Sequence, residues 1–509
     1  MKVHLMHPDA DFDLRSELPA HGGALTQDLE LATLWTAMAG GDRVLFDVAV
    51  RALLLSLRDP EEIVYRQQVL TDCLEHPQAA RELYALAGEA LTAEAHVWGG
   101  ILRDSPRSRL STSLNKLEVY VDFLRRLREM ADRHGAELSS PGFTRFFAMV
   151  VEELDEDYFQ RVESQLRLLR FKGGVLSSAR LAAGNRGTGY VLRHPREQGL
   201  VARVLDRSGM GFTIPDRDEA GMRAVGELEE RGLNPIANAL SQSVDHLKSF
   251  FVLLRAEVGF YVACLNLADR LEERGEPTCL PIPVAAAADE RALATRDLYD
   301  VCLALTLDTP AVGNDLRADG ARLVVITGAN QGGKSTLLRA VGVAQLMLQA
   351  GMFVGAHELR ASVCDGLFTH CKRAEDEELE SGKLDEELRR MSAIADRIAP
   401  HSMLLCNESF ASTNEREGSE IARQVVRAMV DEGVRVLFVT HMFDLADGLH
   451  RQPLEGSLFL RAQRGAEGQR TYKLIEGEPL PTSYGEDSYR RVFGKSLPDR
   501  TAQAPSPAG

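Results

Sequence analysis

The segment from Gly328 to Thr336 has the residue types and the spacing that bind phosphate groups. Two glycines, Gly328 and Gly333, are separated by four residues and followed by Lys334 and Ser335. Glycine lets the backbone curl without Cβ clashes, and the backbone N–H groups at a helix start attract an anion. Lys334 adds a cation for the β- and γ-phosphates, and the Ser335 hydroxyl is the expected Mg²⁺ ligand. The pattern predicts a nucleotide-phosphate site, and the alternative is a glycine-rich turn that binds nothing.

The residues on both sides of this loop predict the elements that must position it. Residues 323–326 are apolar and mostly β-branched, which is typical of a buried strand. The residues after the loop are apolar at helical spacing: Leu337, Leu338, Val341, Ala344 and Leu348. A strand, a glycine-rich turn and a helix start therefore aim backbone N–H groups at one point, where the helix dipole also favours an anion.

Two further apolar strands, 403–406 and 434–439, end in polar residues. The first is followed by Asn407 and Glu408, at the place where a carboxylate usually holds Mg²⁺. Asn407 still offers an oxygen but no charge, so weaker Mg²⁺ binding is expected, and Glu408 is the candidate general base. The second strand leads to His441, which at this edge of a doubly wound sheet can face the γ-phosphate or the attacking water. The alternatives are that Asn407 and Glu408 only cap a strand, and that His441 is a polar core residue.

The segment that begins at Ser412 contains a helix-capping pattern. Asn414 precedes Glu417 by three residues, which is the spacing of an N-terminal helix cap. One interpretation is a capped helix and nothing more. The other is a helix start that faces an anion and reaches a phosphate bound by a second subunit.

These motifs together resemble the MutS family of DNA mismatch-repair ATPases. The resemblance runs from Asn314 to His441, includes the Gly-Gly-Lys-Ser-Thr run with Asn330 before it, and continues more weakly at 482–485. Residues 407–418 align without gaps with the family's Asp-Glu and glycine-rich loop. The resemblance implies ATP and Mg²⁺ as ligands. It implies ATP contacts by Gly328, Asn330, Gly332, Gly333, Lys334, Ser335, Thr336 and Asn414, Mg²⁺ contacts by Ser335 and Asn407, and catalysis by Lys334, Glu408 and His441.

The sequence also departs from the family pattern. Asn407 replaces an Asp, residues 410–412 replace a Gly-Arg-Gly run, and Asn414 stands where a Ser that acts across the dimer is expected. No Phe-x-Glu wedge and no C-terminal nuclease-like module is found in the sequence. The resemblance therefore implies the family's ATPase and its DNA-embracing dimer, with two composite sites, but not mismatch reading.

Composition narrows the class of protein. The chain has 509 residues, of which 44% are hydrophobic and 26% charged, as in soluble globular proteins. No apolar run approaches the ~20 residues of a membrane helix, and the N-terminus lacks the apolar core of a signal peptide. Seven scattered cysteines without a CxxC pair favour reduced thiols in the cytoplasm over a zinc site. A net charge of −16 argues against a protein that coats nucleic acid nonspecifically.

The order of these patterns predicts the domain organisation. We expect loop over 1–25, then an elongated helix-rich core and lever region over 26–300 with a short β-hairpin near 175–193. A doubly wound, ABC-like P-loop ATPase domain of α/β class is expected over 301–497, and a disordered tail over 498–509.

The most basic part of the sequence surrounds the predicted hairpin. Its cationic residues are Arg167, Arg170, Lys172, Arg180, Arg186, Arg193, His194 and Arg196. The stretch is the candidate for phosphate contact with nucleic acid, although basic surface also arises by chance.

Three functions are compatible with these observations. The first is a dimeric, ATP-gated protein that binds double-stranded or branched DNA in repair or recombination, without contact with a membrane. The second is an ATPase that remodels a protein partner and does not bind DNA. The third is a slow nucleotide-binding switch, because Asn407 replaces the usual Asp.

Overall fold

A computed structural model describes residues 1–97, 106–171, 176–185, 187–193, 215, 217–286, 291–329, 331–373, 382–465 and 469–480. The chain divides into two compact units. The helical unit consists of residues 1–5, 9–12 and 76–258, and the α/β unit consists of residues 6–8, 13–75 and 259–509. The predicted α/β class with a helix-rich N-terminal region is confirmed, while the division assigns residues 13–75 to the α/β unit.

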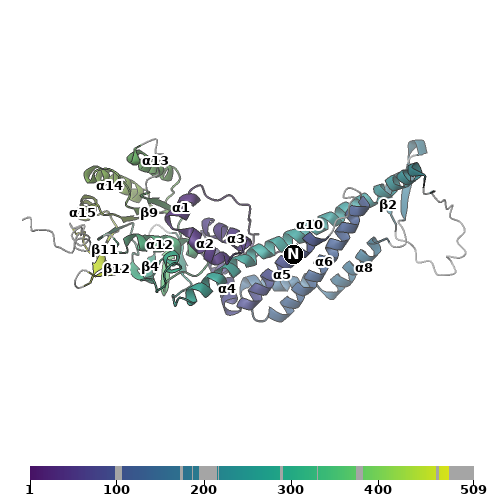
Figure 1. Ribbon diagram of the computed structural model, residues 1–509, viewed down its shortest axis with the longest axis horizontal. Helices are drawn as coiled ribbons and strands as arrows, with labels where there is room; N and C mark the ends of the chain where they lie inside the picture. Colours follow the sequence, from purple (N-terminus) through teal and green to yellow (C-terminus); the bar gives the residue numbers. More distant parts are fainter. Residues whose placement is uncertain are drawn as a thin grey trace, which may run out of the picture. The chain divides into compact units, whose positions relative to one another are not determined.

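The helical unit is built from long amphipathic helices (Figure 1). They are α5 (Pro77–His96), α6 (Pro106–His134), α7 (Pro141–Glu153), α8 (Glu156–Leu169) and the first part of α10 (Glu219–Glu272). In α6 the side chains of Leu114, Leu117, Val121 and Leu124 are buried, as their spacing predicts. The rings of Tyr120 in α6 and Phe251 in α10 stack with centroids 5.4 Å apart. The unit therefore has an apolar and aromatic core between its helices.

Residues 141–169, inside the region predicted to be helix-rich, form two helices. The side chain of Asp155 accepts a hydrogen bond from the Tyr158 backbone N–H and begins α8, after α7 has ended at Glu153. An Asp at this position satisfies a free N–H group of the new helix, so it starts a helix more readily than it continues one. The predicted hairpin is present as β1 (Ser177–Leu181) and β2 (Gly187–Leu192), which pair antiparallel.

The α/β unit contains a six-stranded sheet in the order β12-β11-β6-β10-β9-β8. Its strands are β6 (Leu323–Thr327), β8 (Leu367–Cys371), β9 (Met403–Asn407), β10 (Arg435–Val439), β11 (Ser457–Arg464) and β12 (Arg470–Glu476). All pairs are parallel except β11 with β12. Every residue of β6 and β10 is buried, which explains their continuous apolar sequences.

Helices cover both faces of this sheet. Three helices cover one face: α13 (Lys383–Ala395), α14 (Glu415–Asp431) and α15 (Phe443–Arg451). They pack on the strand residues Leu323, Val325 and Phe438. Along each strand these residues alternate with residues that point to the other face. On the other face lie α12 (Lys334–Gln349) and α1 (Gly22–Asp28), and Figure 1 shows α1 on the opposite side of β9 from α14. This layering leaves the carboxyl ends of the parallel strands available for a site.

The remaining elements of the α/β unit complete its framework. A second, four-stranded sheet has the order β3-β7-β4-β5. Its strands are β3 (Ile282–Val284), β4 (Leu293–Leu298), β5 (Asn314–Arg317) and β7 (Glu358–Ser362), and the further helices are α2 (Leu31–Ala39), α3 (Arg43–Leu54), α4 (Pro60–Glu75) and α11 (Val301–Ala304). The start of α1 at Gly22 lies inside the segment predicted as loop. The predicted tail and residues 482–485 lie outside the described residues.

One described helix, Arg231–Glu272, is long and apolar enough to cross a membrane by length and composition. Of its most apolar window, 78% is buried inside the protein. The apolar residues of this helix therefore form part of the protein core.

Candidate functional site

The segment between β6 and α12 forms a tight cradle of backbone. Gly328 has φ +121° and Gly333, the residue before α12, has φ +90°. A Cβ on Gly328 would lie 2.8 Å from the Ala462 Cβ and 2.9 Å from the Ala462 backbone nitrogen. A Cβ on Gly333 would lie 3.0 Å from the Tyr472 carbonyl oxygen. Both glycines are therefore required by backbone conformation and by the close approach of the β11–β12 hairpin.

The Lys334 ammonium group is held inside this cradle. The residue is buried, and its Nζ donates hydrogen bonds to the carbonyl oxygens of Gly328 (2.9 Å) and Ala329 (3.0 Å). Burial lowers the pKa of Lys334, and the nearby Glu408 carboxylate partly opposes that shift. Within the described residues Lys334 forms no ion pair, so an anion in the cradle would gain a desolvated cation. Asn330, which the family resemblance implies as an ATP contact, lies outside the described residues.

Ser335 and Asn407 lie against each other although 72 residues separate them. The Ser335 hydroxyl donates a hydrogen bond of 2.9 Å to the Asn407 Oδ1. This contact brings together the two oxygens predicted to bind Mg²⁺. Among the described residues no group of three His, Cys, Asp or Glu side chains can hold a metal ion. Mg²⁺ usually keeps several waters and binds through one or two protein oxygens and substrate phosphates, so these two oxygens fit it as a partial donor set.

Glu408 and His441 form a hydrogen-bonded pair at the same edge of the sheet. The Glu408 Oε2 accepts hydrogen bonds from the His441 backbone N–H (3.1 Å) and from the His441 ring Nδ1. The hydrogen bond with Glu408 raises the pKa of His441, against the lowering effect of partial burial. Glu408 has φ +55°, and its backbone N–H donates to the Val439 carbonyl oxygen at 2.9 Å. The carboxylate is thereby directed towards the end of β10.

The strand register explains why these residues meet. Val439 in β10 pairs with Asn407 in β9 on one side and with Ile326 in β6 on the other. The chain leaves all three parallel strands at one edge, so the cradle, Asn407, Glu408 and His441 become neighbours. Gly332 lies in the same loop and Thr336 in the first turn of α12, and a Cβ on Gly332 would lie 2.7 Å from the Ala462 Cβ.

Asn414 is a helix cap in this structure. Its Oδ1 accepts a hydrogen bond from the Glu417 backbone N–H at 3.0 Å, and its Nδ2 donates to the Glu417 Oε2 at 3.2 Å. Glu415 and Glu417 place two carboxylates in the first turn of α14. The Asn414 amide is thus engaged within its own helix, where the acidic first turn complements the helix dipole.

A cavity of about 490 Å³ adjoins the cradle, and the sequence analysis did not predict it. Gln331, Gly333 and Thr336 line it on the loop side, and Tyr472 and Asn314 line it from β12 and β5. Asn314 fixes the hairpin, because its Nδ2 donates to the Tyr472 carbonyl oxygen (3.2 Å) and its Oδ1 accepts from the Leu474 N–H (2.7 Å). No strand was predicted at 470–476, because charged and apolar residues mix there.

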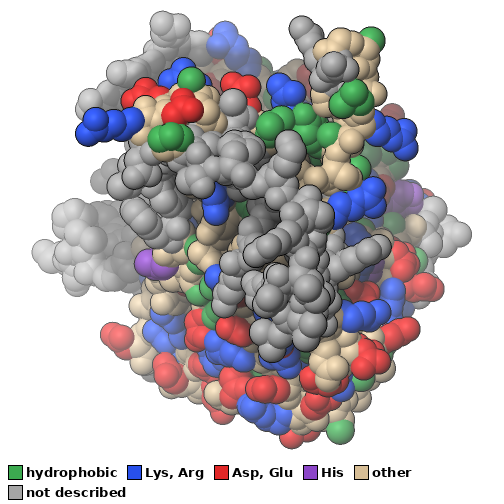
Figure 2. Space-filling model, turned by 90° about the vertical axis from the view of Figure 1, so that its right-hand side faces the viewer, with side chains coloured by type: hydrophobic (Ala, Val, Ile, Leu, Met, Phe, Trp, Pro, Cys, Tyr) green, Lys and Arg blue, Asp and Glu red, His purple; other side chains and the backbone are tan. Residues whose placement is uncertain are grey.

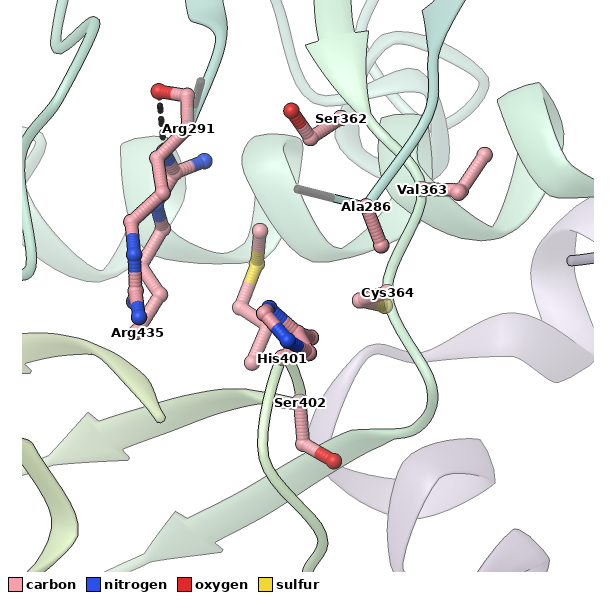
Figure 3. Close-up of a pocket in the computed structure, with 9 residues that line it drawn as sticks. Ala286, Arg291, Ser362, Val363, Cys364, His401, Ser402 and Arg435 are labelled. Carbon is pink, nitrogen blue, oxygen red and sulfur yellow. Dashed lines mark hydrogen bonds between the residues drawn. The ribbon is translucent and has the colours of Figure 1, made fainter. Parts of the chain in front are cut away.

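A second cavity, shown in Figure 3, lies at the opposite edge of the sheet, where β9 and β10 begin. Arg435 is buried there and donates to the carbonyl oxygens of Ala321 and Ala292, both at 3.0 Å, and of Arg291. Burial lowers the pKa of Arg435 to about 10. Figure 3 shows the Ser402 hydroxyl directed away from His401. The cavity holds about 30 Å³, room for about one water, so Arg435 has a structural role there.

Comparison with known proteins finds sequence matches in both parts of the chain. The family model described as the MutS2 N-terminal domain matches residues 58–274, and the model described as MutS domain V matches residues 324–491. The DNA mismatch repair protein MutS of Chloroflexus aurantiacus is 36% identical over 145 residues, which are 28% of this chain and 15% of that protein. The proteins of the same name from Thermotoga petrophila and Thermus aquaticus are 32% identical over 193 residues and 34% over 180 residues. Those matches cover 37% and 35% of this chain but only 24% and 22% of the relatives.

Proposed function

Because this chain belongs to the MutS family, we propose that it binds and hydrolyses ATP with Mg²⁺ and uses the ATP state to control contact with DNA. The observation that carries the proposal is the convergence of Lys334, the Ser335–Asn407 pair and the Glu408–His441 pair at one edge of the sheet. A DNA repair role in the cytoplasm follows from the same family membership.

ATP fits the two features that lie side by side here. The cradle presents backbone N–H groups, a helix start and the Lys334 cation to a triphosphate. The adjoining cavity of about 490 Å³ is within the size range of small-molecule pockets and is lined in part by Tyr472. An aromatic face is a suitable surface for a stacked base.

Ser335 and Asn407 would hold Mg²⁺ through their side-chain oxygens. When bound, the ion neutralises charge on the β- and γ-phosphates. Asn407 contributes no negative charge, so the affinity for Mg²⁺ rests on the phosphates more than it would with Asp at this position.

Hydrolysis in this site is attack of water on the γ-phosphorus. As the water oxygen bonds to phosphorus, the bond between phosphorus and the β–γ bridging oxygen breaks. The bridging oxygen leaves as part of ADP. Glu408 accepts the proton that the water loses, and the His441 N–H groups hold the Glu408 carboxylate in place until then. Lys334 and the loop N–H groups stabilise the charge that moves onto the bridging oxygen.

DNA contact is proposed for the hairpin and not for the helix before it. Arg167 is paired with Glu163 at 3.2 Å, and Arg170 is paired with Glu118 through two hydrogen bonds. Arg180 in β1 is exposed and has no ion pair within the described residues. Lys172, Arg186, His194 and Arg196 lie outside those residues. Figure 2 shows cationic and anionic side chains interspersed on the face it presents, so phosphate contact requires local cations such as Arg180.

The same ion pairs favour a second candidate function. Arginines already neutralised by glutamates, on a chain with net charge −16, suit contact with another protein better than contact with a polyanion.

The family-implied homodimer, in which Asn414 faces the partner's nucleotide, is part of the first proposal. In a dimer of this kind the Asn414 amide would exchange its Glu417 contact for one across the interface.

Binding of a nonhydrolysable ATP analogue with Mg²⁺, measured by calorimetry, tests the proposal. Lys334→Ala should lose tight binding because the buried cation held among the loop carbonyls is removed. Lys2→Ala, which removes an exposed lysine paired with Asp11, is the control and should bind as the unaltered protein does. Equal affinity in all three proteins contradicts the site assignment.

A further inference from the structure

The loop after β9 is held in an unusual backbone conformation. Glu408 has φ +55° and Phe410 has φ +63°, both in the left-handed region that residues other than glycine rarely adopt. Such conformations persist only where the surrounding structure fixes them, and they cluster at functional sites. The question is therefore what fixes this loop.

A buried hydrogen bond between Ser409 and His370 is the first fastening. The side chains of both residues are fully buried, and the Ser409 hydroxyl lies 2.8 Å from the His370 Nδ1 and 2.7 Å from the His370 carbonyl oxygen. The His370 Nε2 lies 3.0 Å from the carbonyl oxygen of Glu387, which can only accept, so Nε2 carries the proton. Burial lowers the pKa of His370 to about 4, so the ring is neutral and Nδ1 is bare, and the single Ser409 hydroxyl hydrogen is shared between Nδ1 and the His370 carbonyl oxygen.

Two further contacts fasten the same loop to β8 and α13. The fully buried Phe410 ring stacks on the His370 ring, with centroids 5.3 Å apart and an angle of 25° between the planes. The Ser412 hydroxyl donates to the Glu387 Oε1 at 3.0 Å, and Glu387 in α13 is buried. His370 and Glu387 thus hold the residues that follow Glu408, which are Ser409, Phe410 and Ser412.

We propose that His370 and Ser409 are positioning residues for ATP hydrolysis, which set the turn that directs the Glu408 carboxylate to His441, with Glu387 linking that turn to α13. This inference rests on the proposed function, because it assigns a role to Glu408 in hydrolysis. Neither residue contacts the site where ATP is proposed to bind. A displacement of α13 would therefore change turnover through Glu408 and leave the phosphate cradle unchanged.

The test compares Ser409→Ala, His370→Phe and the double variant. His370→Phe keeps a ring to stack on Phe410 but removes both nitrogens. Each variant should lower the ATP turnover number roughly 10- to 100-fold, as displacement of a reacting group does. The affinity for a nonhydrolysable ATP analogue should stay unchanged. The double variant should lose less than the product of the two single losses, because both single variants break the same contact between Ser409 and the His370 Nδ1.

A readout independent of turnover accompanies this comparison. Amide hydrogen exchange over residues 408–412 should be faster in Ser409→Ala, since the loop has lost its buried fastening. Ser419→Ala is the matched control: Ser419 is another buried serine of the α/β unit, and its hydroxyl has no hydrogen-bond partner within the described residues. It should leave turnover, affinity and exchange at 408–412 as they are.

The outcomes separate the inference from the proposed function. Unchanged turnover and exchange in Ser409→Ala overturn the inference, and so does a parallel loss of turnover and affinity, which indicates a merely structural role. If the unaltered protein neither binds nor hydrolyses ATP, the proposed function fails, and the inference with it, whatever the exchange data show. Should His370→Phe not fold, Ser412→Ala replaces it: a fall in turnover at constant affinity supports the link to Glu387, and no fall contradicts it.

Discussion

Replacement of Gly328 by Ala tests whether the cradle has the geometry described above. Two costs add at this position. A side chain at φ +121° costs about 1–3 kcal/mol of backbone strain, and a Cβ 2.8–2.9 Å from Ala462 adds about 1–3 kcal/mol of overpacking. The lower sum, about 2 kcal/mol, corresponds to a roughly 30-fold loss of affinity if the loop rearranges to relieve the strain. We therefore expect Gly328→Ala to bind a nonhydrolysable ATP analogue at least roughly 30-fold more weakly in calorimetry.

Two companion variants divide this cost into its parts. Gly320 has φ +73° with open space around its Cβ position, so Gly320→Ala introduces strain without a collision and away from the cradle. It should lower the thermal midpoint but keep the affinity for the analogue. Ala462→Gly removes one of the two colliding atoms, so it should restore part of the affinity lost in Gly328→Ala. Unchanged affinity in Gly328→Ala, or an equal loss in Gly320→Ala, would refute the reasoning.

Three further predictions concern the metal site, the pH dependence and the hairpin. Asn407→Asp should lower the Mg²⁺ concentration for half-maximal turnover roughly tenfold, because it supplies a charged oxygen ligand; tenfold corresponds to about 1.4 kcal/mol of binding free energy. If the Mg²⁺ titration does not shift, Asn407 is not a metal ligand. Because the pKa of His441 is raised above its ordinary 6.5, its pairing with Glu408 is complete below that pH and is lost as pH rises through the raised value. The Glu408 carboxylate then loses a contact that holds it, so turnover should fall over that range, and the fall should vanish in His441→Gln; an unaltered profile contradicts the pairing. Arg180→Ala should reduce the slope of log affinity for duplex DNA against log salt concentration by about 1. Arg167→Ala, which removes an arginine paired with Glu163, should change that slope little. No DNA binding at any salt concentration favours the protein-remodelling function.

The strands of the candidate site could be predicted from the sequence because their signals are local. Residues 323–326, 403–406 and 434–439 are short apolar runs, and each is a buried parallel strand in the structure. Their polar ends were placed at one edge by the general rule for such sheets. The break between α7 and α8 does not follow from apolar spacing, which continues across it, although Asp155 carries a capping signal.

The features contributed from a distance could not be predicted. Tyr472 reaches the cradle from a strand of mixed polarity, and Ser409 gains its significance only from His370, which lies in another strand. Neither residue has a spacing motif, since the contacts join segments whose separation in sequence carries no periodic signal. Packing of the folded α/β unit alone brings them together.

The dependence of the cradle on the β11–β12 hairpin has a consequence for synthesis of the chain. Gly328 rests against Ala462, and the hydrogen bond from the Thr327 hydroxyl to the Leu460 carbonyl spans 133 residues. At ribosomal rates of about 5–20 residues per second, the second half of the cradle emerges on the order of ten seconds after the first. During that interval the apolar strand β6 waits for the strands that will flank it, β10 and β11. Under the proposed function, a nascent chain therefore cannot use nucleotide binding to assist its early folding, and ATP would stabilise only a molecule whose α/β unit has been translated through β12.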